Sequence, residues 1–249
     1  MVVYDGNTGG VLFDFLAFEA AFTGGVFVAA GDIDRDGRAD LVVTPDVGGG
    51  PRARVLSAGN PGRVIADMFA IDDPNFRGGI RPAIGDVNGD GFGDLVVTAG
   101  AGGGPRVAVW DGASLAGAPA RLVPDFFAFE ETLRDGAYLA VGDVDRDGRA
   151  DLIAGAGPGG APRVVTFLAA DLFAGRRVPA VSYMAGDVAE RGGVPVAVAD
   201  IDGDGRVEVV TGAGAGSFPQ VRLSDPRTGR ALDEFAAQYM AFRGGIFVG

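Results

Sequence analysis

The 249-residue chain contains no lysine, no histidine and no cysteine, so all 21 of its basic residues are arginine. Without histidine there is no imidazole base, and without histidine or cysteine there is no ordinary zinc, haem or iron–sulfur site. Without lysine there is neither a Schiff-base amine nor the lysine of a phosphate-binding loop. Disulfides cannot form. These absences exclude many kinds of enzyme active site.

The charge balance is acidic, since 33 acidic residues give a formal net charge of −12. Nucleic acids and anionic lipid surfaces bind basic proteins, so we expect no nucleic-acid partner. No segment approaches ~18 consecutive apolar residues, and the first residues lack the pattern of a signal peptide, so we expect no membrane insertion. A hydrophobic fraction of 47% nevertheless predicts a packed core.

One segment occurs four times along the chain. The copies read GDIDRDGRADLVV, GDVNGDGFGDLVV, GDVDRDGRADLIA and ADIDGDGRVEVVT. Their first aspartates are 54, 57 and 57 residues apart, and a proline follows 19 residues after each of them. A constant distance of 19 beside a varying period places the insertions elsewhere, in surface loops.

The rest of each period predicts short strands. In the first repeat, four segments are rich in branched or aromatic residues and are bounded by Gly, Pro, Asn or Asp: Val26–Ala29, Leu41–Thr44, Ala53–Leu56 and Val64–Phe69. No window shows a sustained helical stripe of apolar residues. Four strands in a period of about 55 residues, repeated along the chain, are typical of β-propeller blades. We therefore expect an all-β fold and a β-propeller.

The repeat predicts one β-propeller domain over residues 1–249. Complete blades are expected at about 25–71, 79–129, 136–183 and 193–235, and the terminal segments 1–18 and 245–249 should contribute to a further blade. The first hypothesis is a five-bladed propeller whose incomplete fifth blade is assembled from both termini. The alternative is an open fragment of a longer propeller. For the oligomeric state we expect either a monomer or an oligomer in which another chain completes the fifth blade.

Each repeat carries oxygen ligands at alternating positions of a short loop. The spacing is Asp-x-Asp-x-Asp-Gly-x-x-Asp, and the glycine allows the chain to turn sharply. The candidate ligands at loop positions one, three, five and nine are Asp32, Asp34, Asp36 and Asp40; Asp86, Asn88, Asp90 and Asp94; Asp143, Asp145, Asp147 and Asp151; and Asp200, Asp202, Asp204 and Glu208. An all-oxygen ligand set with several carboxylates favours Ca²⁺. Asn88 lacks a charge, so the second site should bind more weakly.

Two other interpretations of these loops can be compared with the sequence. An EF-hand needs a glutamate at loop position twelve, where this chain has Val43, Val97, Ala154 and Thr211, and it needs flanking helices, so that interpretation fails. The loops could also be aspartate-rich turns held by side-chain hydrogen bonds alone. The fourfold fixed spacing favours metal binding.

With this loop in every period, the chain resembles the FG-GAP repeat family (VCBS-type, integrin α-chain-like) over almost its whole length. The resemblance implies a calcium loop between the first two strands of each blade, and about four Ca²⁺ per chain. It also implies that the backbone carbonyl at loop position seven is a ligand. The residues at this position are Arg38, Phe92, Arg149 and Arg206.

Arg52, Arg106 and Arg163 follow the turn proline at corresponding places in three repeats. They could form a ring of cations that binds an anion, or they could have a structural or solvated role. The acids outside the loops, for example Glu19, Glu130 and Glu131, form no evident convergent pair.

The leading functional hypothesis is a non-catalytic calcium-binding propeller that acts as a scaffold or as a recognition and adhesion module. The resemblance implies an extracellular or cell-surface location, and the partner would be an unknown protein or glycan. A calcium-dependent, lectin-like carbohydrate-binding propeller is the alternative. A lyase or hydrolase that uses paired carboxylates ranks third, so we expect no enzyme activity.

Overall fold

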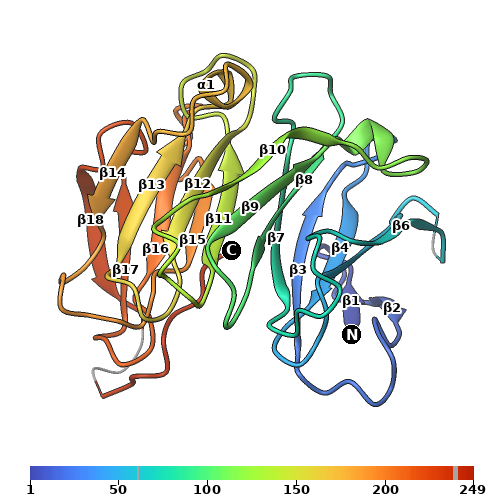
Figure 1. Ribbon diagram of the computed structural model, residues 1–249, viewed down its shortest axis with the longest axis horizontal. Coiled ribbons are helices and arrows are strands. Elements are labelled where there is room, and N and C mark those ends of the chain that lie inside the picture. Colours follow the sequence, from blue (N-terminus) through green and yellow to red (C-terminus); the bar gives the residue numbers. More distant parts are fainter. Residues whose placement is uncertain (61, 238–240) are drawn as a thin grey trace.

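The computed structural model describes residues 1–60, 62–237 and 241–249, and it shows an all-β protein (Figure 1). Four antiparallel sheets have four strands each, and we call them blades 1 to 4 in chain order. Blade 1 contains β3 (Val26–Gly31), β4 (Asp40–Pro45), β5 (Arg52–Leu56) and β6 (Val64–Phe69). Blade 2 contains β7 (Ile80–Gly85), β8 (Asp94–Ala99), β9 (Arg106–Trp110) and β10 (Arg121–Phe127). The expected four-stranded antiparallel sheets are therefore present.

The last two sheets have the same construction. Blade 3 contains β11 (Ala137–Gly142), β12 (Asp151–Ala156), β13 (Arg163–Phe167) and β14 (Val181–Met184). Blade 4 contains β15 (Val196–Ala199), β16 (Glu208–Gly212), β17 (Gln220–Ser224) and β18 (Ala231–Ala236). In every blade, each strand pairs with the next strand in the chain, so the second strand lies inside the sheet. All six residues of β8 and of β12 are buried, because other blades cover both faces of these strands.

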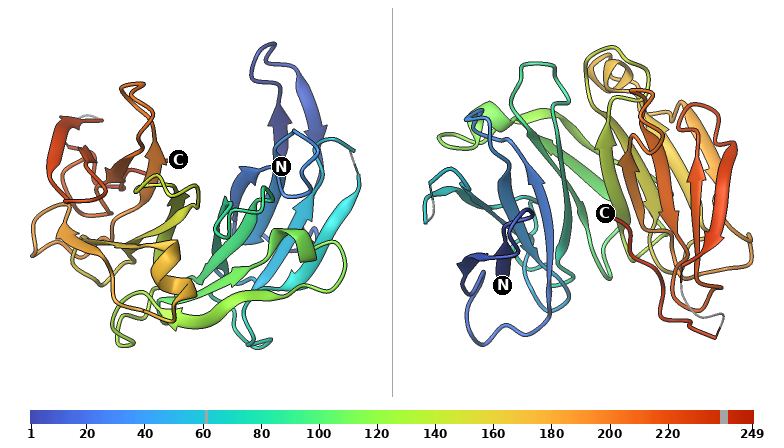
Figure 2. Two further views of the ribbon diagram at one scale, coloured as in Figure 1. Left: turned by 90° about the horizontal axis from the view of Figure 1, so that it is seen from above. Right: turned by 180° about the vertical axis from the view of Figure 1, so that it is seen from behind.

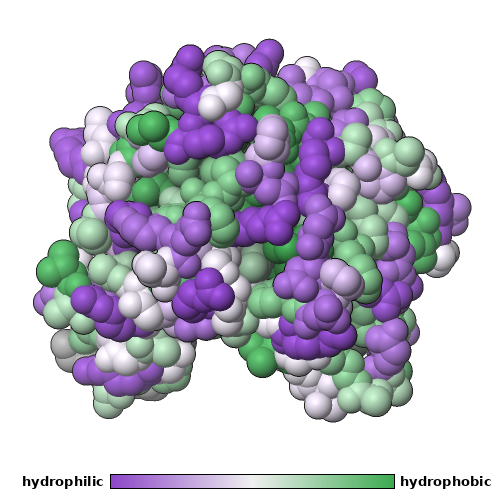
Figure 3. All heavy atoms as spheres, in the orientation of Figure 1, coloured by the Kyte–Doolittle hydropathy of each residue, from purple (hydrophilic) through white to green (hydrophobic). Residues whose placement is uncertain are grey.

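The blades are arranged in an arc, with β1 and β2 at one end and blade 4 at the other (Figure 2). The first strands β3, β7, β11 and β15 contact one another in this order along the arc. Three hydrophobic clusters fill the spaces between successive blades. On the face shown in Figure 3, hydrophilic and hydrophobic residues are interspersed. The main core therefore lies between blades, as expected for repeats that bury their apolar faces against their neighbours.

The terminal segments do not combine into one sheet. The strands β1 (Val2–Tyr4) and β2 (Val11–Asp14) pair only with each other among the described residues, and Gly245–Gly249 forms no strand. The N–H of Ile246 instead donates to the carbonyl of Ala213 at 2.8 Å, beside blade 4. The prediction that 1–18 and 245–249 contribute to one further blade therefore stays a prediction. In blades 1 to 4 the first strand pairs with the second. By their place in the repeat, β1 and β2 correspond to the third and fourth strands of a blade, so neither of them is the strand with which a first strand pairs. The number of blades stays a prediction.

Arginines at the turn after the second strand link neighbouring blades. Arg52 forms an ion pair with Glu19 at 2.9 Å, and Arg163 forms one with Glu130 at 2.9 Å. In each pair the acid belongs to the preceding repeat. Arg106 lies 4.0 Å from Asp72 and also pairs with Asp125 of its own blade. These arginines already have carboxylate partners, which supports the structural role over the anion-binding ring.

Helical structure in the described residues is limited to a 3₁₀ turn (Gly112–Ser114) and the five-residue helix α1 (Ala169–Phe173). Both lie between the third and fourth strands of a blade, where the repeats differ in length. Neither is long and apolar enough to cross a membrane. The sequence pattern does not reveal them because a single turn has no helical periodicity.

Four glycines at the start of a blade lie against a backbone carbonyl at the end of a second strand or in the turn after it, in the same blade for Gly24, Gly78 and Gly192 and in the preceding blade for Gly136. An added Cβ would overlap a backbone carbonyl oxygen at Gly24, Gly78, Gly136 and Gly192. At Gly78 the oxygen belongs to Ala101, and the backbone conformation of Gly78 does not itself require glycine. Glycine is therefore needed at this position because there is no space for a side chain.

We predict that Gly78→Ala lowers the free energy of unfolding by roughly 2 kcal/mol or more, because the methyl group must displace a backbone carbonyl. Gly6→Ala is the matched control, since nothing lies within 4 Å of its added Cβ. Urea unfolding of the two variants measures the difference. Equal stabilities would contradict the close approach at Gly78.

Candidate metal sites

Each aspartate-rich loop joins the first and second strands of a blade, and its position-one carboxylate folds the loop around itself. Asp32 accepts hydrogen bonds from the backbone N–H groups of Asp36 at 3.1 Å and Gly37 at 2.9 Å. Asp86 accepts the same two bonds in its loop. Asp143 and Asp200 accept from the N–H groups at positions four and six of theirs. The glycine at position six has a positive φ in every loop, 83° at Gly37, which explains why the motif needs glycine there.

The position-five carboxylate orients the residue at position seven. Asp36 accepts a hydrogen bond from the N–H of Arg38 at 2.9 Å, and the other three loops repeat this bond. The four residues at position seven are Arg38, Phe92, Arg149 and Arg206. Among the described residues, no group donates a hydrogen bond to their carbonyl oxygens. These predicted backbone ligands are therefore available to a cation.

Three loops bring carboxylates close enough to share one ion. In each group, one ligand atom from every residue lies within 4.8 Å of the others. The groups are Asp32, Asp34 and Asp36; Asp143, Asp145 and Asp151; and Asp200, Asp202 and Glu208. In the second loop, the Asn88 amide instead donates to Asp90 at 2.9 Å. The acidic loops of blades 1, 3 and 4 could therefore bind a metal ion.

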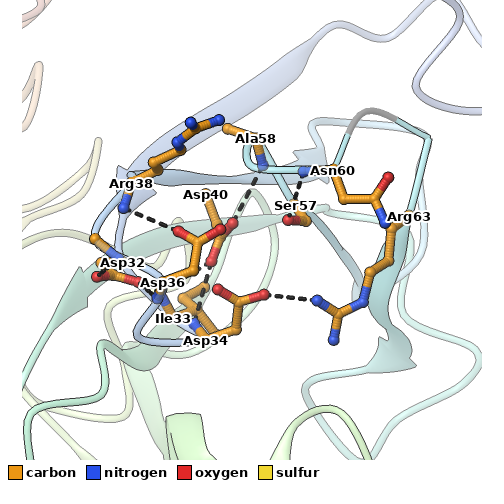
Figure 4. Close-up of polar contacts among 11 residues, drawn as sticks. Asp32, Ile33, Asp34, Asp36, Arg38, Asp40, Ser57, Ala58, Asn60 and Arg63 are labelled. Carbon is orange, nitrogen blue, oxygen red and sulfur yellow. Dashed lines mark hydrogen bonds and ion pairs between the residues drawn. The ribbon is translucent and has the colours of Figure 1, made fainter.

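One buried carboxylate oxygen in the first loop has no hydrogen-bond partner, and a bound cation would be its partner. Asp34 accepts a hydrogen bond from Arg63 through Oδ2 at 2.7 Å, and the contact is visible in Figure 4. Its Oδ1 is buried and has no hydrogen-bond partner. A buried carboxylate oxygen without a donor is unfavourable. The residues of this loop therefore fit a hard cation held by oxygen ligands.

The position-nine carboxylates have a second role that the sequence interpretation missed. Asp40 accepts hydrogen bonds from the N–H of Ile33 at 3.0 Å and, on the other side, from the N–H of Ala58 at 3.2 Å (Figure 4). Asp94 bonds Val87 and Gly112 in the same way, and Asp151 bonds Val144 and Ala169. The two bonded residues lie 7 before and 18 after the aspartate in all three blades. This constant spacing is the feature of the sequence from which the second role could have been predicted.

Burial changes the protonation of these carboxyl groups in the metal-free chain. Asp94 and Asp151 are at most 1% exposed, and burial raises the pKa of each carboxyl to about 6. Backbone N–H groups oppose this shift, and Asp90 adds to it at Asp94. Burial also raises the pKa of Asp40. A bound cation would favour the ionised form that burial disfavours.

Arginines at loop position four connect neighbouring loops. Arg35 donates to the carbonyl of Asp90 at 3.2 Å, and Arg146 donates to the carbonyl of Gly205 at 2.9 Å. Both arginines have a positive φ, 61° and 68°, which is unfavourable for a side chain of this size. Each places a cation between two acidic loops. The sequence pattern alone indicates no role for Arg35 and Arg146.

Comparison with known proteins agrees with the repeat. Residues 86–154 match the family model described as FG-GAP-like repeat. This stretch begins at the first aspartate of the second loop and ends within β12. No curated protein matches the chain significantly.

Several solved structures are similar at low identity. One is the rhamnogalacturonan lyase YesW, with 12% identity, a TM-score of 0.46, and coverage of 88% of this chain and 49% of the lyase. A second is an Agrocybe aegerita lectin that recognises non-reducing terminal N-acetylglucosamine, with 21% identity, a TM-score of 0.45, and coverage of 86% and 52%. The V. cholerae biofilm matrix protein Bap1 has 18% identity, a TM-score of 0.41, and coverage of 85% and 39%. The chain thus spans about half or less of these structures.

The four repeated blades and their acidic loops define a β-propeller repeat protein. The family match falls on one repeat, and the same loop and strands recur in the other three. The chain therefore contains an FG-GAP-like repeat at residues 86–154.

We predict that the metal-free chain loses stability as the pH rises from about 4 to about 7. A carboxyl whose folded pKa of about 6 exceeds its ordinary value of 3.8 stabilises the fold at low pH, and this contribution is lost as the pH rises through 6. The loss should be roughly 1–3 kcal/mol per carboxyl. Urea unfolding in EDTA at pH 4.5 and pH 7 measures it.

Asp94→Asn should reduce this pH dependence, because the amide cannot ionise. Glu131→Gln is the control, since Glu131 is an exposed acid outside the loops. A pH dependence that is the same in Asp94→Asn and in the unmodified chain would contradict the assignment.

Proposed function

We propose that the chain is a non-catalytic calcium-binding β-propeller module, which acts as a scaffold or as a recognition and adhesion surface of a secreted or cell-surface protein. The observation that most directly supports this proposal is the acidic loop. It recurs in four blades with the same spacing, and in the first blade it contains a buried carboxylate oxygen with no partner.

The chemistry of the ligands supports calcium. Every candidate donor is an oxygen, which disfavours zinc, copper and iron. Each loop offers several carboxylates and one backbone carbonyl, whereas Mg²⁺ usually keeps several of its waters. The four loops would hold about four ions per chain. Extracellular calcium at millimolar concentration would fill sites of the affinity usual for extracellular modules, with a Kd of about 10⁻⁴–10⁻³ M.

The acids outside the loops support a non-catalytic role. Glu19 and Glu130 lie at the surface and pair with arginines of the next blade. The backbone N–H of each glutamate, and then its arginine partner, lower the pKa of the carboxyl group. A general acid at neutral pH needs a raised pKa instead. These pairs therefore fit blade-to-blade contacts better than acid–base chemistry.

Calcium should stabilise the chain because the loops have their ligand geometry only in the folded state. We expect calorimetric titration of the chelator-treated chain to find about four Ca²⁺, and EDTA to lower the melting temperature. Asp34→Asn should weaken the first site several-fold, because it leaves that loop with the same neutral ligand as the second loop, while Glu131→Gln should leave all sites unchanged. A melting temperature that chelation does not change would overturn the calcium assignment.

The second site offers a test of ligand charge. Asn88→Asp restores the carboxylate that the other loops have at position three, and affinity in such loops rises with the number of charged ligands. We expect this variant to bind calcium several-fold more tightly at that site, as measured by calorimetry. An unchanged titration would show that Asn88 is not a ligand.

Recognition can be examined with a glycan array, with and without calcium. Calcium-dependent binding of a defined glycan would favour the lectin-like alternative over a scaffold. Glycan binding that persists in EDTA would separate recognition from the metal sites.

A further inference from the structure

Position four of the acidic loops, which we number 1 to 4 after their blades, alternates between arginine and glycine. Loops 1 and 3 have Arg35 and Arg146 at this position, whereas loops 2 and 4 have Gly89 and Gly203. All four residues have a positive φ, between 61° and 79°. Glycine adopts this conformation readily, and for arginine it is unfavourable. Both arginine side chains make a contact that glycine cannot make.

Each of these side chains reaches the same part of the next loop. Arg35 donates through Nη1 to the carbonyl of Asp90, at position five of loop 2, at 3.2 Å. Arg146 donates through Nη2 to the carbonyls of Asp204 and Gly205, at positions five and six of loop 4, at 3.2 and 2.9 Å. A charged donor strengthens such hydrogen bonds. Loops 1 and 2 are thus joined by one arginine, and loops 3 and 4 by the other.

The glycine at position six of the receiving loop leaves room for the guanidinium group. An added Cβ at Gly91 would lie 3.0 Å from Cζ of Arg35, and an added Cβ at Gly205 would lie 3.3 Å from Nη2 of Arg146. At the position-six glycines of loops 1 and 3, nothing lies within 4 Å of an added Cβ. The arginine contact is therefore specific to loops 2 and 4.

A backbone contact between neighbouring loops provides a comparison. The N–H of Gly93 donates to the carbonyl of Asp32 at 2.7 Å, and the N–H of Ala150 donates to the carbonyl of Asp86 at 2.7 Å. This bond therefore joins loop 1 to loop 2 and loop 2 to loop 3. These groups adjoin the ends of strands, so the sheets fix them whether or not calcium is bound. Within the described part of the chain, an arginine of position four crosses only the first of these two boundaries.

The arginine lies between two candidate ligands of its own loop. Asp34 and Asp36 flank Arg35, so a calcium ion held by both carboxylates fixes the backbone of Arg35. The bond from its side chain to loop 2 favours the same conformation. Calcium in loop 2 would in turn hold Asp90 and its carbonyl in place. Each ion therefore removes conformational freedom that the other ion would otherwise have to remove.

We propose that Arg35 couples the calcium sites of loops 1 and 2, and that Arg146 couples those of loops 3 and 4. An ion in one loop of a pair raises the affinity of the other loop, and the effect is reciprocal. This inference rests on the proposed calcium binding. The two arginines are positioning residues, because the carboxylates and carbonyls bind the ion. The sites fill in two pairs, and loops 2 and 3 are not coupled in this way.

NMR of an isotope-labelled chain can follow each loop separately. The N–H groups of Gly37 and Gly91 donate to the position-one carboxylates Asp32 and Asp86 at 2.9 and 2.8 Å, so their amide signals should shift when calcium binds there. Calcium is added to the chelator-treated chain in about 0.15 M salt, which screens exposed charges beyond roughly 8 Å. The calcium concentration at the midpoint of the Gly91 shift measures the affinity of loop 2.

A variant that disables loop 1 tests the coupling. Asp34→Ala combined with Asp36→Ala removes two of the four carboxylates, so the empty loop has a charge of −2, the same as the intact loop with one Ca²⁺. We expect the Gly91 midpoint to rise at least about fivefold, because loop 2 loses its ordered neighbour. When Arg35→Gly is also present, disabling loop 1 should leave the midpoint unchanged. An equal rise with and without Arg35 would overturn the proposal.

Loop 3 provides the matched control. Asp145→Ala combined with Asp147→Ala removes the same two carboxylates beside loop 2, across the boundary that no arginine of position four crosses, and should leave the Gly91 midpoint unchanged. If the loop 1 variant does not fold, the second pair replaces it. The loop 3 variant should then raise the midpoint at Gly205, whose N–H donates to the position-one carboxylate of loop 4, and Arg146→Gly should abolish this rise. A rise that persists without the arginine would contradict the coupling.

The same spectra distinguish failure of the coupling from failure of the calcium assignment. If calcium shifts none of the loop glycine signals, the loops do not bind it, and both the proposed function and the coupling are wrong. Saturable shifts at Gly37 and Gly91, with a Gly91 midpoint that does not depend on loop 1, would overturn the coupling alone.

Discussion

A buried carboxylate at the start of the second strand is the interaction on which blades 1 to 3 depend. Asp40 holds the N–H of Ile33 on one side and that of Ala58 on the other, so one side chain fixes both the acidic loop and the connection after the third strand. Fixing the loop places the position-two side chain against the next blade. The hydrogen bonds of one aspartate thus determine the local loop geometry and, through it, the packing between blades.

The sequence predicts the features that depend on local spacing. The strands of the first repeat and the positions of the loops follow from short apolar segments between turn residues, and the structure has strands at these places. The pairing of Arg52 with Glu19 was not predicted, because it joins residues 33 positions apart. The segment 245–249, expected to contribute to a further blade, forms no strand in the structure, and its contribution to that blade stays a prediction. Sequence equivalence identified its place in a blade but gave no information about a partner strand.

The candidate sites were predicted to a similar extent. Alternating carboxylates around a glycine identify the loops, and three of the four bring acidic groups together. The sequence pattern alone does not distinguish the four ligand positions from one another. The structure distinguishes them, because positions one and five bind backbone N–H groups of their own loop, whereas position nine also reaches a segment 18 residues away. Hydrogen bonds over that distance depend on the folded sheet.

The contacts between blades have a mechanical consequence. Each blade touches mainly the blades beside it, and its own four strands are consecutive in the chain. Tension applied to the two ends would therefore act first on a terminal blade, which can separate while the others stay folded. Each released blade would lengthen the chain by its roughly 55 residues, at up to about 3.3–3.6 Å per residue. An array built in this way would extend in steps and absorb work at every step.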